Sequence, residues 1–582
     1  MRIERRLSDL QQPFDVVIIG GGITGVNVAR ETAGRGLRTL LVDKGDFGEG
    51  TSSATSKYIH GGIRYLEQYQ FGVVRESLRE RRILGLAAPH LVSQTRFVMP
   101  AWKWSKPGAG LIGAGVGLYR ALGYDANRGA PESLRIPNPR WLSKATVRRD
   151  IPWINPHELQ GAWAYHDTMN VHPERLLLAL LQSAVACGAV AMNHMRADSF
   201  ITSPAPGDGL RVDGVELVDS LTGLRHCVRA RTVVNAGGPW MDLVLGELRP
   251  RLGVGVNRSK GVHLLTRPLG GRDAVFARAH SGHHVIVSPW QGYSFIGPTD
   301  TPMGDTDPDD LGVDGDDVRL LLDTVNDTID PASSTPLLTE DDIESVSVGI
   351  RPLVMKEGSS TYRASRKAEL YDHADRGVVN LWSIGGGKWT TGRAIAEHVA
   401  ETLLRSPALR DVTPLTFDSR RLAVFGTFAW AQDADQYLLQ AARSRQELAL
   451  TPEVRIHLAR LYGTEHERIL DLVSAEPALG RRISTRPGRL DIAAQAVFAV
   501  TDECARTLGD VVHRRLVLGT LGRSTQTELL DVACLIAALL GWNPEQSSAE
   551  VSDELNRQEL VGRFAAARWA PRATVSVRDD RS

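Results

Sequence analysis

The sequence is poor in cysteine and has no long apolar run. Its four cysteines, Cys187, Cys227, Cys504 and Cys534, are far apart among 582 residues, without a Cys-x-x-Cys pair or the spacing of metal ligands. This pattern predicts a reducing compartment and no metal or iron–sulfur site. The residues before the first apolar run lack the apolar core of a signal peptide, and no stretch reaches the ~20 apolar residues that cross a bilayer. We therefore expect a cytoplasmic chain.

An excess of charge of either sign is also missing. Lysine plus arginine and aspartate plus glutamate both total 68, so the composition does not suggest nucleic acid as a partner. Any electrostatic recognition must therefore be local. The length is too great for one hydrophobic core, and two to four domains are expected.

The N-terminal region contains the clearest motif. The β-branched run Val16 to Ile19 predicts a parallel strand buried on both faces, and it leads directly into Gly20-Gly21-Gly22-Ile23-Thr24-Gly25. In such a turn Gly20 permits the tight bend, Gly22 lets a pyrophosphate approach the backbone, and Gly25 lets the following helix pack on the strand. The predicted helix, Val26 to Gly34, would direct its N-terminal N–H groups and its dipole at the phosphates.

An acid follows the next strand. Leu37 to Asp43 reads as a strand, and Asp43 lies 18 residues beyond Gly25, near the spacing of the carboxylate that binds an adenosine ribose hydroxyl. A glycine-rich turn can serve packing alone, but strand, turn, helix, strand and acid in this order favour a dinucleotide site. FAD is favoured over NAD because the polar segment Gly50 to Lys57 follows in place of a second strand and helix.

Later elements indicate a discontinuous nucleotide-binding domain with insertions. Gly377 to Thr391 is a second strand that runs into a glycine-rich turn, His263 to Pro298 has the short runs of an antiparallel sheet, and helical spacing dominates beyond about Pro407. We therefore expect an α/β FAD-binding domain of the glutathione-reductase or amino-acid-oxidase type, with an inserted antiparallel substrate domain and an all-helical C-terminal domain. The expected ranges are 14–80, 156–240 and 341–405 for the FAD-binding domain, 81–155 and 241–340 for the substrate or cap domain, 406–570 for the helical domain, and 571–582 for a disordered tail.

Two segments are apolar without being long enough to span a bilayer. Leu529 to Trp542 is interrupted by Asp531 and predicts a buried helix. Gly108 to Tyr119 follows a basic and aromatic stretch, Trp102 to Lys106, of the kind found at membrane interfaces. This second segment is either a core helix or a monotopic membrane contact.

Cations near the glycine-rich turns indicate an anionic substrate. Arg64, Arg351 and Arg366 follow or lie in such loops, and Lys388 belongs to the second glycine turn. Guanidinium groups bind phosphate oxygens through paired, charge-assisted hydrogen bonds. Any one of these residues alone is more often part of a surface salt bridge.

These motifs resemble a known family. Gly50-Thr51-Ser52-Ser53, Ile59 to Glu67, Gly349 to Leu353 and Gly385 to Thr391 are similar to signatures of FAD-dependent glycerol-3-phosphate dehydrogenases, as are Asn235 to Trp240, Lys260 to His263 and Gly297 to Asp300. The matches run in order over about residues 14 to 400, and Leu461 to Gly463 and Ala505 to Leu508 resemble the family's helical C-terminal domain.

The resemblance implies an activity. It implies oxidation of sn-glycerol 3-phosphate to dihydroxyacetone phosphate, with hydride transfer from C2 to N5 of FAD and electrons passed to a respiratory quinone. It also implies a homodimer and a peripheral contact with the cytoplasmic face of the inner membrane.

Individual residues carry over from the family motifs. The substrate-binding positions are Arg64, Tyr65, Thr299, Asp300, Arg366 and Lys388. The cofactor-binding positions are Gly20, Gly22, Gly25, Asp43, Lys44, Thr51, Ser52, Ser53, Lys57, His60, Gly61, Gly62, Ala236, Gly237, Gly386, Gly387, Lys388 and Thr390.

The catalytic positions are Arg351, His263 and His60. Arg351 would face the reacting C2 oxygen and stabilise its developing negative charge. His263 is the first choice as proton acceptor because imidazole titrates near neutral pH, and His60 is the second. A structural hydrogen-bonding role remains open for both histidines.

Three alternatives remain. A glycerol-3-phosphate oxidase would share fold and substrate but reduce oxygen to hydrogen peroxide. An amino-acid or amine oxidase of the same superfamily would need one carboxylate clamp in place of several cations. A flavin-containing regulatory module without turnover is disfavoured by the intact candidate site.

Overall fold

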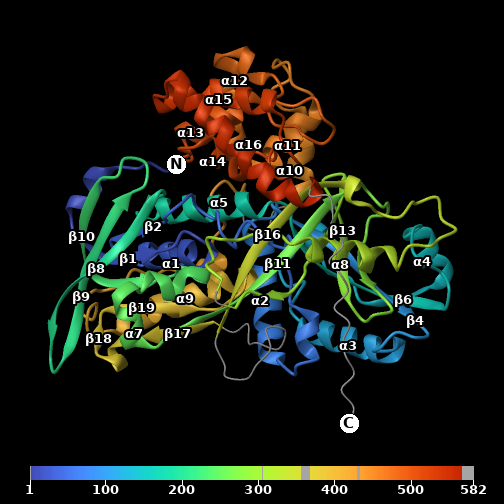
Figure 1. Cartoon of the computed structure of the whole chain (residues 1–582), viewed down its shortest axis with the longest axis horizontal. Helices are drawn as coiled ribbons and strands as arrows, with labels where there is room; N and C mark the ends of the chain where they lie inside the picture. The colour runs from blue at the N-terminus through green and yellow to red at the C-terminus, as the bar shows by residue number, and fades with distance from the viewer. Residues whose placement is uncertain (1, 305, 355–367, 429–432, 567–582) are drawn as a thin grey trace, which may run out of the picture.

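Two sheets and a helical C-terminal domain make up the molecule (Figure 1). The computed structural model describes residues 2–304, 306–354, 368–428 and 433–566. The main path of the first sheet has the order β17-β19-β10-β1-β2-β7, and the pairs along this path are parallel except β17 with β19. Its strands are β1 (Phe14–Ile19), β2 (Thr39–Val42), β7 (Val190–Met192), β10 (Arg225–Asn235), β17 (Glu369–Asp372) and β19 (Leu381–Gly385).

The first sheet is covered on both faces, as the sequence of its first strand predicts. Val16 and Ile18 of β1 pack with helices α1 (Ile23–Gly34), α5 (Pro173–Ala186) and α9 (Gly392–Arg405). Val17 and Ile19 face the opposite side, in a core with β8 (Met195–Ala205), β9 (Gly209–Asp219) and the first half of β10. The side chains from Val16 to Ile19 are all buried. Successive residues of a strand point to opposite faces, and both faces of this sheet are covered. The short β18 (Val378–Val379) pairs with β9.

The second sheet has mostly antiparallel pairs, with one parallel pair between β12 and β4. Its strands are β3 (Tyr58–Ile59), β4 (Val92–Trp102), β5 (Arg140–Ser143), β6 (Leu159–Asn170), β11 (Val256–Thr266), β12 (Ala274–Arg278), β13 (His284–Trp290), β14 (Tyr293–Gly297), β15 (Thr301–Pro302) and β16 (Ile343–Val354). One face packs on α2 (Phe71–Ala87), α3 (Ala109–Leu122) and the C-terminal domain, and the other on α4 (Lys144–Asp150) and α8 (Gly315–Asn326).

Three strands of the second sheet lie in ranges that the sequence groups with the FAD-binding domain. The sequence analysis assigns 14–80, 156–240 and 341–405 to that domain, whereas β3, β6 and β16 form their hydrogen bonds in the second sheet. In β16 the polar and apolar residues of Ser345 to Val348 alternate, which fits its pairing with β11 over eleven register positions. Each of these three ranges therefore contributes strands to both sheets, and the loops that join those strands lie where the two sheets meet.

The C-terminal domain is helical, as predicted, and lies at the top of the molecule in Figure 1, above α5, β11 and β16. Its helices are α10 (Ala434–Arg443), α11 (Pro452–Tyr462), α12 (His466–Ala475), α13 (Ala493–Thr501), α14 (Leu508–Asp510), α15 (Gln526–Leu540) and α16 (Pro544–Ala566), with the π-helical turn η12 (Val511–Arg515) after α14. The sequence does not predict a separate helix over the range of α16. The tail 571–582 lies outside the described residues. The fold class is confirmed.

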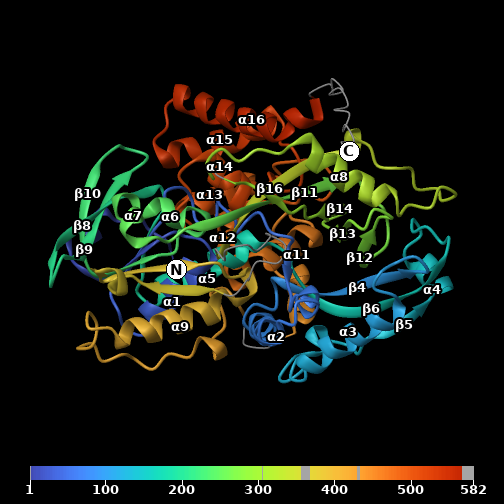
Figure 2. The ribbon, with the colours of Figure 1, turned by 60° about the horizontal axis from the view of Figure 1, so that its bottom comes forward.

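The apolar segment at 108–119 forms α3, on the side of the molecule away from the helical domain in both views (Figures 1 and 2). Its inner face buries Ile112, Val116 and Tyr119, whereas Leu111 is 67% and Leu118 42% exposed. Within the described residues no helix is long and apolar enough to cross a membrane.

Candidate active site

The first glycine turn holds β1, α1 and β10 in close backbone contact. A Cβ on Gly25 would lie 1.9 Å from the carbonyl oxygen of Gly20, and one on Gly20 would lie 2.6 Å from that of Ala236. Gly20 also has φ +110°, a conformation that favours glycine. Because the first N–H groups of a helix have no intrahelical acceptor, the start of α1 is suited to an anion.

Asp43 closes the turn from the end of β2. Its carboxylate accepts hydrogen bonds from the Gly21 N–H at 2.6 Å and the Gly45 N–H at 2.9 Å. Burial raises the pKa of Asp43 to about 6, although these two hydrogen bonds favour the ionised form. The next residue, Lys44, is exposed, pairs with Asp309 at 2.5 Å and lies 4.4 Å from the Trp240 ring centre.

The polar segment 50–57 packs between α1 and β16. Ser52 accepts a hydrogen bond from the Ile23 N–H at 2.9 Å, and Thr51 donates one to the Ile350 carbonyl at 2.5 Å. The Ser53 hydroxyl donates a hydrogen bond to the Gly50 carbonyl, within the same segment. Lys57 is buried and paired with Glu174 at 3.0 Å, which gives its ammonium a structural partner. The segment therefore links the glycine turn to the second sheet.

The second glycine turn follows β19 and faces the same segment. Gly386 and Gly387 have φ +70° and +94°, so their backbone conformation favours glycine. The Thr390 hydroxyl accepts a hydrogen bond from the His60 N–H at 3.3 Å. Ala236 and Gly237, after β10, complete the ring of small residues at the ends of parallel strands. Cofactors bind at this edge in open α/β sheets.

A cationic group surrounds Tyr65. The Lys388 ammonium lies 4.7 Å and the Arg64 guanidinium 5.6 Å from the Tyr65 ring centre. Gly62 has φ +74°, and a Cβ there would lie 2.2 Å from the Tyr65 ring. Lys388 also donates a hydrogen bond to Ser77 of α2. We call Arg64, Tyr65 and Lys388 the cationic cluster.

His60 lies next to this cluster. Burial lowers the pKa of His60 to about 4, opposed by Asp167 and reinforced by Lys388, Arg64 and Arg81. The imidazole is therefore neutral at physiological pH and able to accept a proton or a hydrogen bond.

Arg351 is fixed by a shell of acceptors where β16 pairs with β11. Its guanidinium donates to the carbonyls of Thr299 at 2.9 Å and Lys260 at 3.2 Å, and lies 3.4 Å from the Asp300 carboxylate. A Cβ on Gly261 would lie 2.3 Å from this guanidinium, so glycine is needed there.

Asp300 and Thr299 support Arg351 from the other side. Ser259 donates a hydrogen bond to Asp300, while Asp300 Oδ2 is buried without a hydrogen-bond partner in the described part of the chain. The Thr299 hydroxyl accepts the Val262 N–H at 3.1 Å. Because a carboxylate repels phosphate, Asp300 is better suited to accept a hydrogen bond from a hydroxyl group than to bind a phosphate oxygen.

His263 is 3% exposed and stacks on Phe295, with ring centres 4.8 Å apart. Its Nε2 is 2.9 Å from the Ser56 hydroxyl, and its Nδ1 is buried without a partner among the described residues. Burial lowers the pKa of His263 to about 3, with further lowering by Arg351 and Lys57. This imidazole is neutral as well.

The two halves of the site are connected by one short segment. Ser56 contacts His263 on the Arg351 side, and His60 contacts Thr390 on the side of the cationic cluster. Four residues span at most about 14 Å, the scale of a flavin ring with a small substrate beside it. Arg366 lies outside the described residues.

Sequence reasoning missed the support behind the His60–Gly62 turn. The Gly61 N–H donates to the Tyr119 hydroxyl at 2.7 Å, and Tyr119 donates to the Asp167 carboxylate at 2.5 Å. Arg81 donates to the same carboxylate at 2.8 Å. The three side chains come from α2, α3 and β6, and no local pattern in the sequence joins these elements.

The residues at this edge fit FAD. The open start of α1 and the glycine approach suit a diphosphate, Asp43 suits a ribose hydroxyl, and the second glycine turn leaves room for a flat ring at the backbone.

Comparisons with known proteins agree with this assignment. Residues 15–402 match the model of the "FAD dependent oxidoreductase" family, and residues 420–547 match the "C-terminal domain of alpha-glycerophosphate oxidase". A glycerol-3-phosphate dehydrogenase of Synechocystis sp. is 33% identical over 92% of this chain and 95% of its own. Glycerol-3-phosphate dehydrogenase 2 of Mycobacterium bovis is 32% identical over 94% and 88%. The crystal structure of the Bacillus halodurans glycerol-3-phosphate dehydrogenase with FAD has a TM-score of 0.74 at 26% identity, covering 97% of each chain.

We expect FAD binding to weaken in acid because FAD and a proton compete for Asp43. The carboxylate must be ionised to accept a ribose hydroxyl, and its raised pKa of about 6 favours the protonated, ligand-free form below that pH. The Kd for FAD, measured by flavin fluorescence between pH 5 and 8, should be flat above pH 6 and rise up to about tenfold per pH unit below it. Asp43→Asn should bind FAD more weakly and lose this dependence; an equally steep profile in that variant would contradict the assignment.

Proposed function

The chain belongs to the FAD-dependent glycerol-3-phosphate dehydrogenases, and from this premise we propose that it oxidises sn-glycerol 3-phosphate to dihydroxyacetone phosphate and passes the electrons to a respiratory quinone. One observation carries the substrate assignment. Neutral His263 of β11 is hydrogen-bonded to Ser56 on the Arg351 side of the segment 56–60, and neutral His60 lies at its other end beside Arg64 and Lys388. This combination suits a substrate with a phosphate at one end and an alcohol to be oxidised at the other.

In this proposal the cationic cluster binds the phosphate. Arg64 and Lys388 supply the charge, Tyr65 is packed between them as a further donor, and Arg366 belongs to the same group by family resemblance. Thr299 positions the Arg351 side of the site through its backbone carbonyl. The phosphate therefore fixes one end of the substrate and leaves C2 near Arg351.

FAD, when bound, accepts the hydride that leaves C2. Arg351 directs its guanidinium at the C2 oxygen and stabilises the negative charge that develops there, the term that usually dominates such catalysis. His263 takes the hydroxyl proton, with His60 as the alternative. Both imidazoles are weak bases in the ligand-free chain, and the negative charge of a bound phosphate raises the proton affinity of any base beside it.

Two observations bear on the electron acceptor. The outer face of α3 presents Leu111, Ala114, Leu118 and Ala121 without a charged side chain, and exposed Lys103 and Lys106 precede it. An apolar face next to basic residues suits an anionic lipid surface, where a quinone is dissolved. We therefore propose that α3 holds the protein peripherally on the cytoplasmic face of the inner membrane; the homodimer is proposed from the family resemblance alone.

An oxygen-reducing glycerol-3-phosphate oxidase is the second candidate. The match of residues 420–547 to the C-terminal domain of alpha-glycerophosphate oxidase favours it. The two activities share the substrate half-reaction and differ in how the reduced flavin is reoxidised.

The first test is anaerobic addition of glycerol 3-phosphate to the holoenzyme. We expect the flavin absorbance near 450 nm to bleach, because the site supplies a phosphate clamp and a base; an unbleached flavin would refute the proposed activity. Reoxidation by a soluble quinone should then be at least about tenfold faster than by air. Faster reoxidation by air, with stoichiometric hydrogen peroxide, would assign the oxidase.

Arg351→Ala should retain FAD and slow flavin reduction about 10²- to 10³-fold, the usual loss when one stabilising donor is removed. Stopped-flow reduction at saturating substrate measures this effect. Arg267→Ala is the matched control, since Arg267 follows β11, forms an ion pair with Asp342 at 2.6 Å and lies outside the site. Equal reduction rates in the two variants would remove Arg351 from catalysis.

The double variant Leu111→Glu with Leu118→Glu should bind anionic vesicles at least about tenfold more weakly in a flotation assay, because each leucine loses its apolar burial in the lipid. Leu439→Glu is the control, since Leu439 is 58% exposed on α10 of the helical domain. If the double variant and the control float like the unchanged chain, α3 is not the lipid contact.

A further inference from the structure

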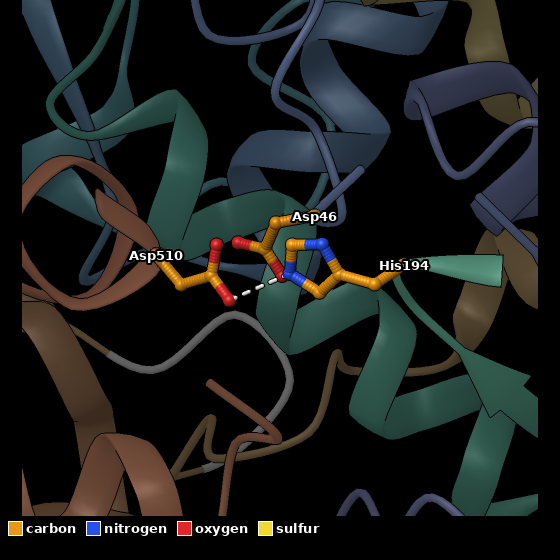
Figure 3. Close-up of side chains that lie close together, drawn as sticks. All are labelled: Asp46, His194 and Asp510. Carbon is orange, nitrogen blue, oxygen red and sulfur yellow. Dashed lines mark hydrogen bonds and ion pairs between the residues drawn. The ribbon is translucent and has the colours of Figure 1, made fainter. Parts of the chain in front are cut away.

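A buried ionic cluster joins the C-terminal domain to the loop that carries Asp43. Asp46, His194 and Asp510 meet at its centre, from three distant parts of the chain (Figure 3). His194 Nε2 is 2.9 Å from Asp510 Oδ2, and all three side chains are buried. The cluster lies outside the candidate active site, on the adenosine side of the glycine turn.

The charge of Asp46 is neutralised by two arginines of the C-terminal turn η12. Arg515 donates to both carboxylate oxygens of Asp46, and Arg514 Nε donates to Oδ2. Asn193 adds a fourth donor at 2.9 Å. The side chains of Asp46 and Arg515 are fully buried, and that of Arg514 is 5% exposed. Such a bidentate, dehydrated pair has a defined geometry.

This donor set argues against a metal ion. The oxygens and nitrogen of Asp46, His194 and Asp510 lie within 4.8 Å of one another, a spacing that metal ligands share. Arg514 bridges Asp46 and Asp510, however, with its NH2 group 2.8 Å from Asp510 Oδ1. Two guanidinium groups occupy the positions that a cation would need, so the cluster is an ion-pair network.

The loop held by this network is the one that closes on the glycine turn. Asp46 lies three residues after Asp43, whose carboxylate is bonded to Gly21 and Gly45. The Gly48 N–H donates to the Gly21 carbonyl at 3.0 Å, and a Cβ on Gly21 would lie 2.7 Å from the Phe47 ring. The loop 43–48 is thus bonded to Gly21 at both ends, through Asp43 and Gly48, and to η12 between them, through Asp46.

Other buried contacts tie the same surfaces together. Arg175 of α5 forms two hydrogen bonds of 2.7 Å with Glu503, and the Glu503 carbonyl accepts a bond from Arg515 at 2.8 Å. Asn193 donates to the Cys504 carbonyl at 2.9 Å. These hydrogen bonds therefore hold η12 in a fixed position relative to the nucleotide-binding sheet.

We propose that Arg514 and Arg515 are positioning residues for FAD: the helical domain sets the loop 43–48 and, through it, the ribose-binding carboxylate of Asp43. The helical domain then contributes to cofactor affinity without contacting the cofactor. The residues that would hold the flavin ring, at the second glycine turn and the segment 56–60, make none of the described contacts with Arg514 or Arg515, so on this proposal hydride transfer would not depend on these arginines.

The test measures FAD affinity in the full-length chain. Arg515→Met removes the guanidinium, and Arg515→Lys keeps the charge but loses the bidentate geometry. Fluorescence titration of the apoprotein should show a Kd for FAD raised at least about tenfold by Arg515→Met, with Arg515→Lys between it and the unchanged chain. Binding of ADP alone should weaken by a similar factor. At saturating FAD, the visible flavin spectrum and its photoreduction should be unchanged.

Arg489→Met is the matched control. Arg489 is also fully buried in the helical domain, and its hydrogen bonds go to the carbonyls of Leu521 and Arg523 in the same domain. We expect it to lower thermal stability while changing the Kd for FAD less than threefold. An unchanged Kd in Arg515→Met, or an equal rise in Arg489→Met, would overturn the proposal. If Arg515→Met does not fold, the same comparison with Arg515→Lys decides. FAD and ADP binding are read without glycerol 3-phosphate, so the outcome is independent of the proposed activity.

Discussion

Close backbone contact at the first glycine turn is the constraint on which the other parts of the site depend. Gly25 brings α1 against the Gly20 carbonyl, and Gly20 brings β1 against the Ala236 carbonyl. A side chain at either position would separate the strand, the helix and β10, because no methyl group fits in the space. The segments 50–57, 60–66 and 386–390 all pack against elements that this contact places, directly or through β16. The cationic cluster and Arg351 thus depend on glycines that carry no charge, in addition to the charged side chains that contact them.

The sequence predicts this part of the molecule well, because its signals are local. Strand, turn and helix follow one another between Val16 and Gly34, and the helix predicted at Val26 to Gly34 is observed within α1. The sequence groups β6 and β16 with the FAD-binding domain, whereas the structure pairs them in the second sheet. The partners of these strands lie far away in the sequence, so a local pattern does not contain them. The role of Asp46 is hidden for the same reason: its partners, Arg514 and Arg515, are 468 and 469 positions away.

Electrostatics gives the two histidines and the arginines complementary roles. His60 and His263 have lowered pKa values since they are buried near cations, so neither adds positive charge to the site at neutral pH. The sequence favours His263 because imidazole normally titrates near neutrality, but burial beside Arg351 lowers its pKa to about 3, so in the ligand-free chain it is a neutral, weak base. In the proposed reaction, the charge of the entering anion raises the proton affinity of this imidazole.

The long separation between Asp46 and its arginines has a consequence for how the protein is made. Asp46 leaves the ribosome 468 residues before Arg514, which at ~5–20 residues per second corresponds to about half a minute to a minute and a half of translation. During that interval the nucleotide-binding strands β1, β2, β7 and β10 are already synthesised, but the carboxylate of Asp46 has no guanidinium partner and must stay hydrated. On the proposal that Arg514 and Arg515 set the loop 43–48, the nascent chain would complete this loop only after the last domain emerges.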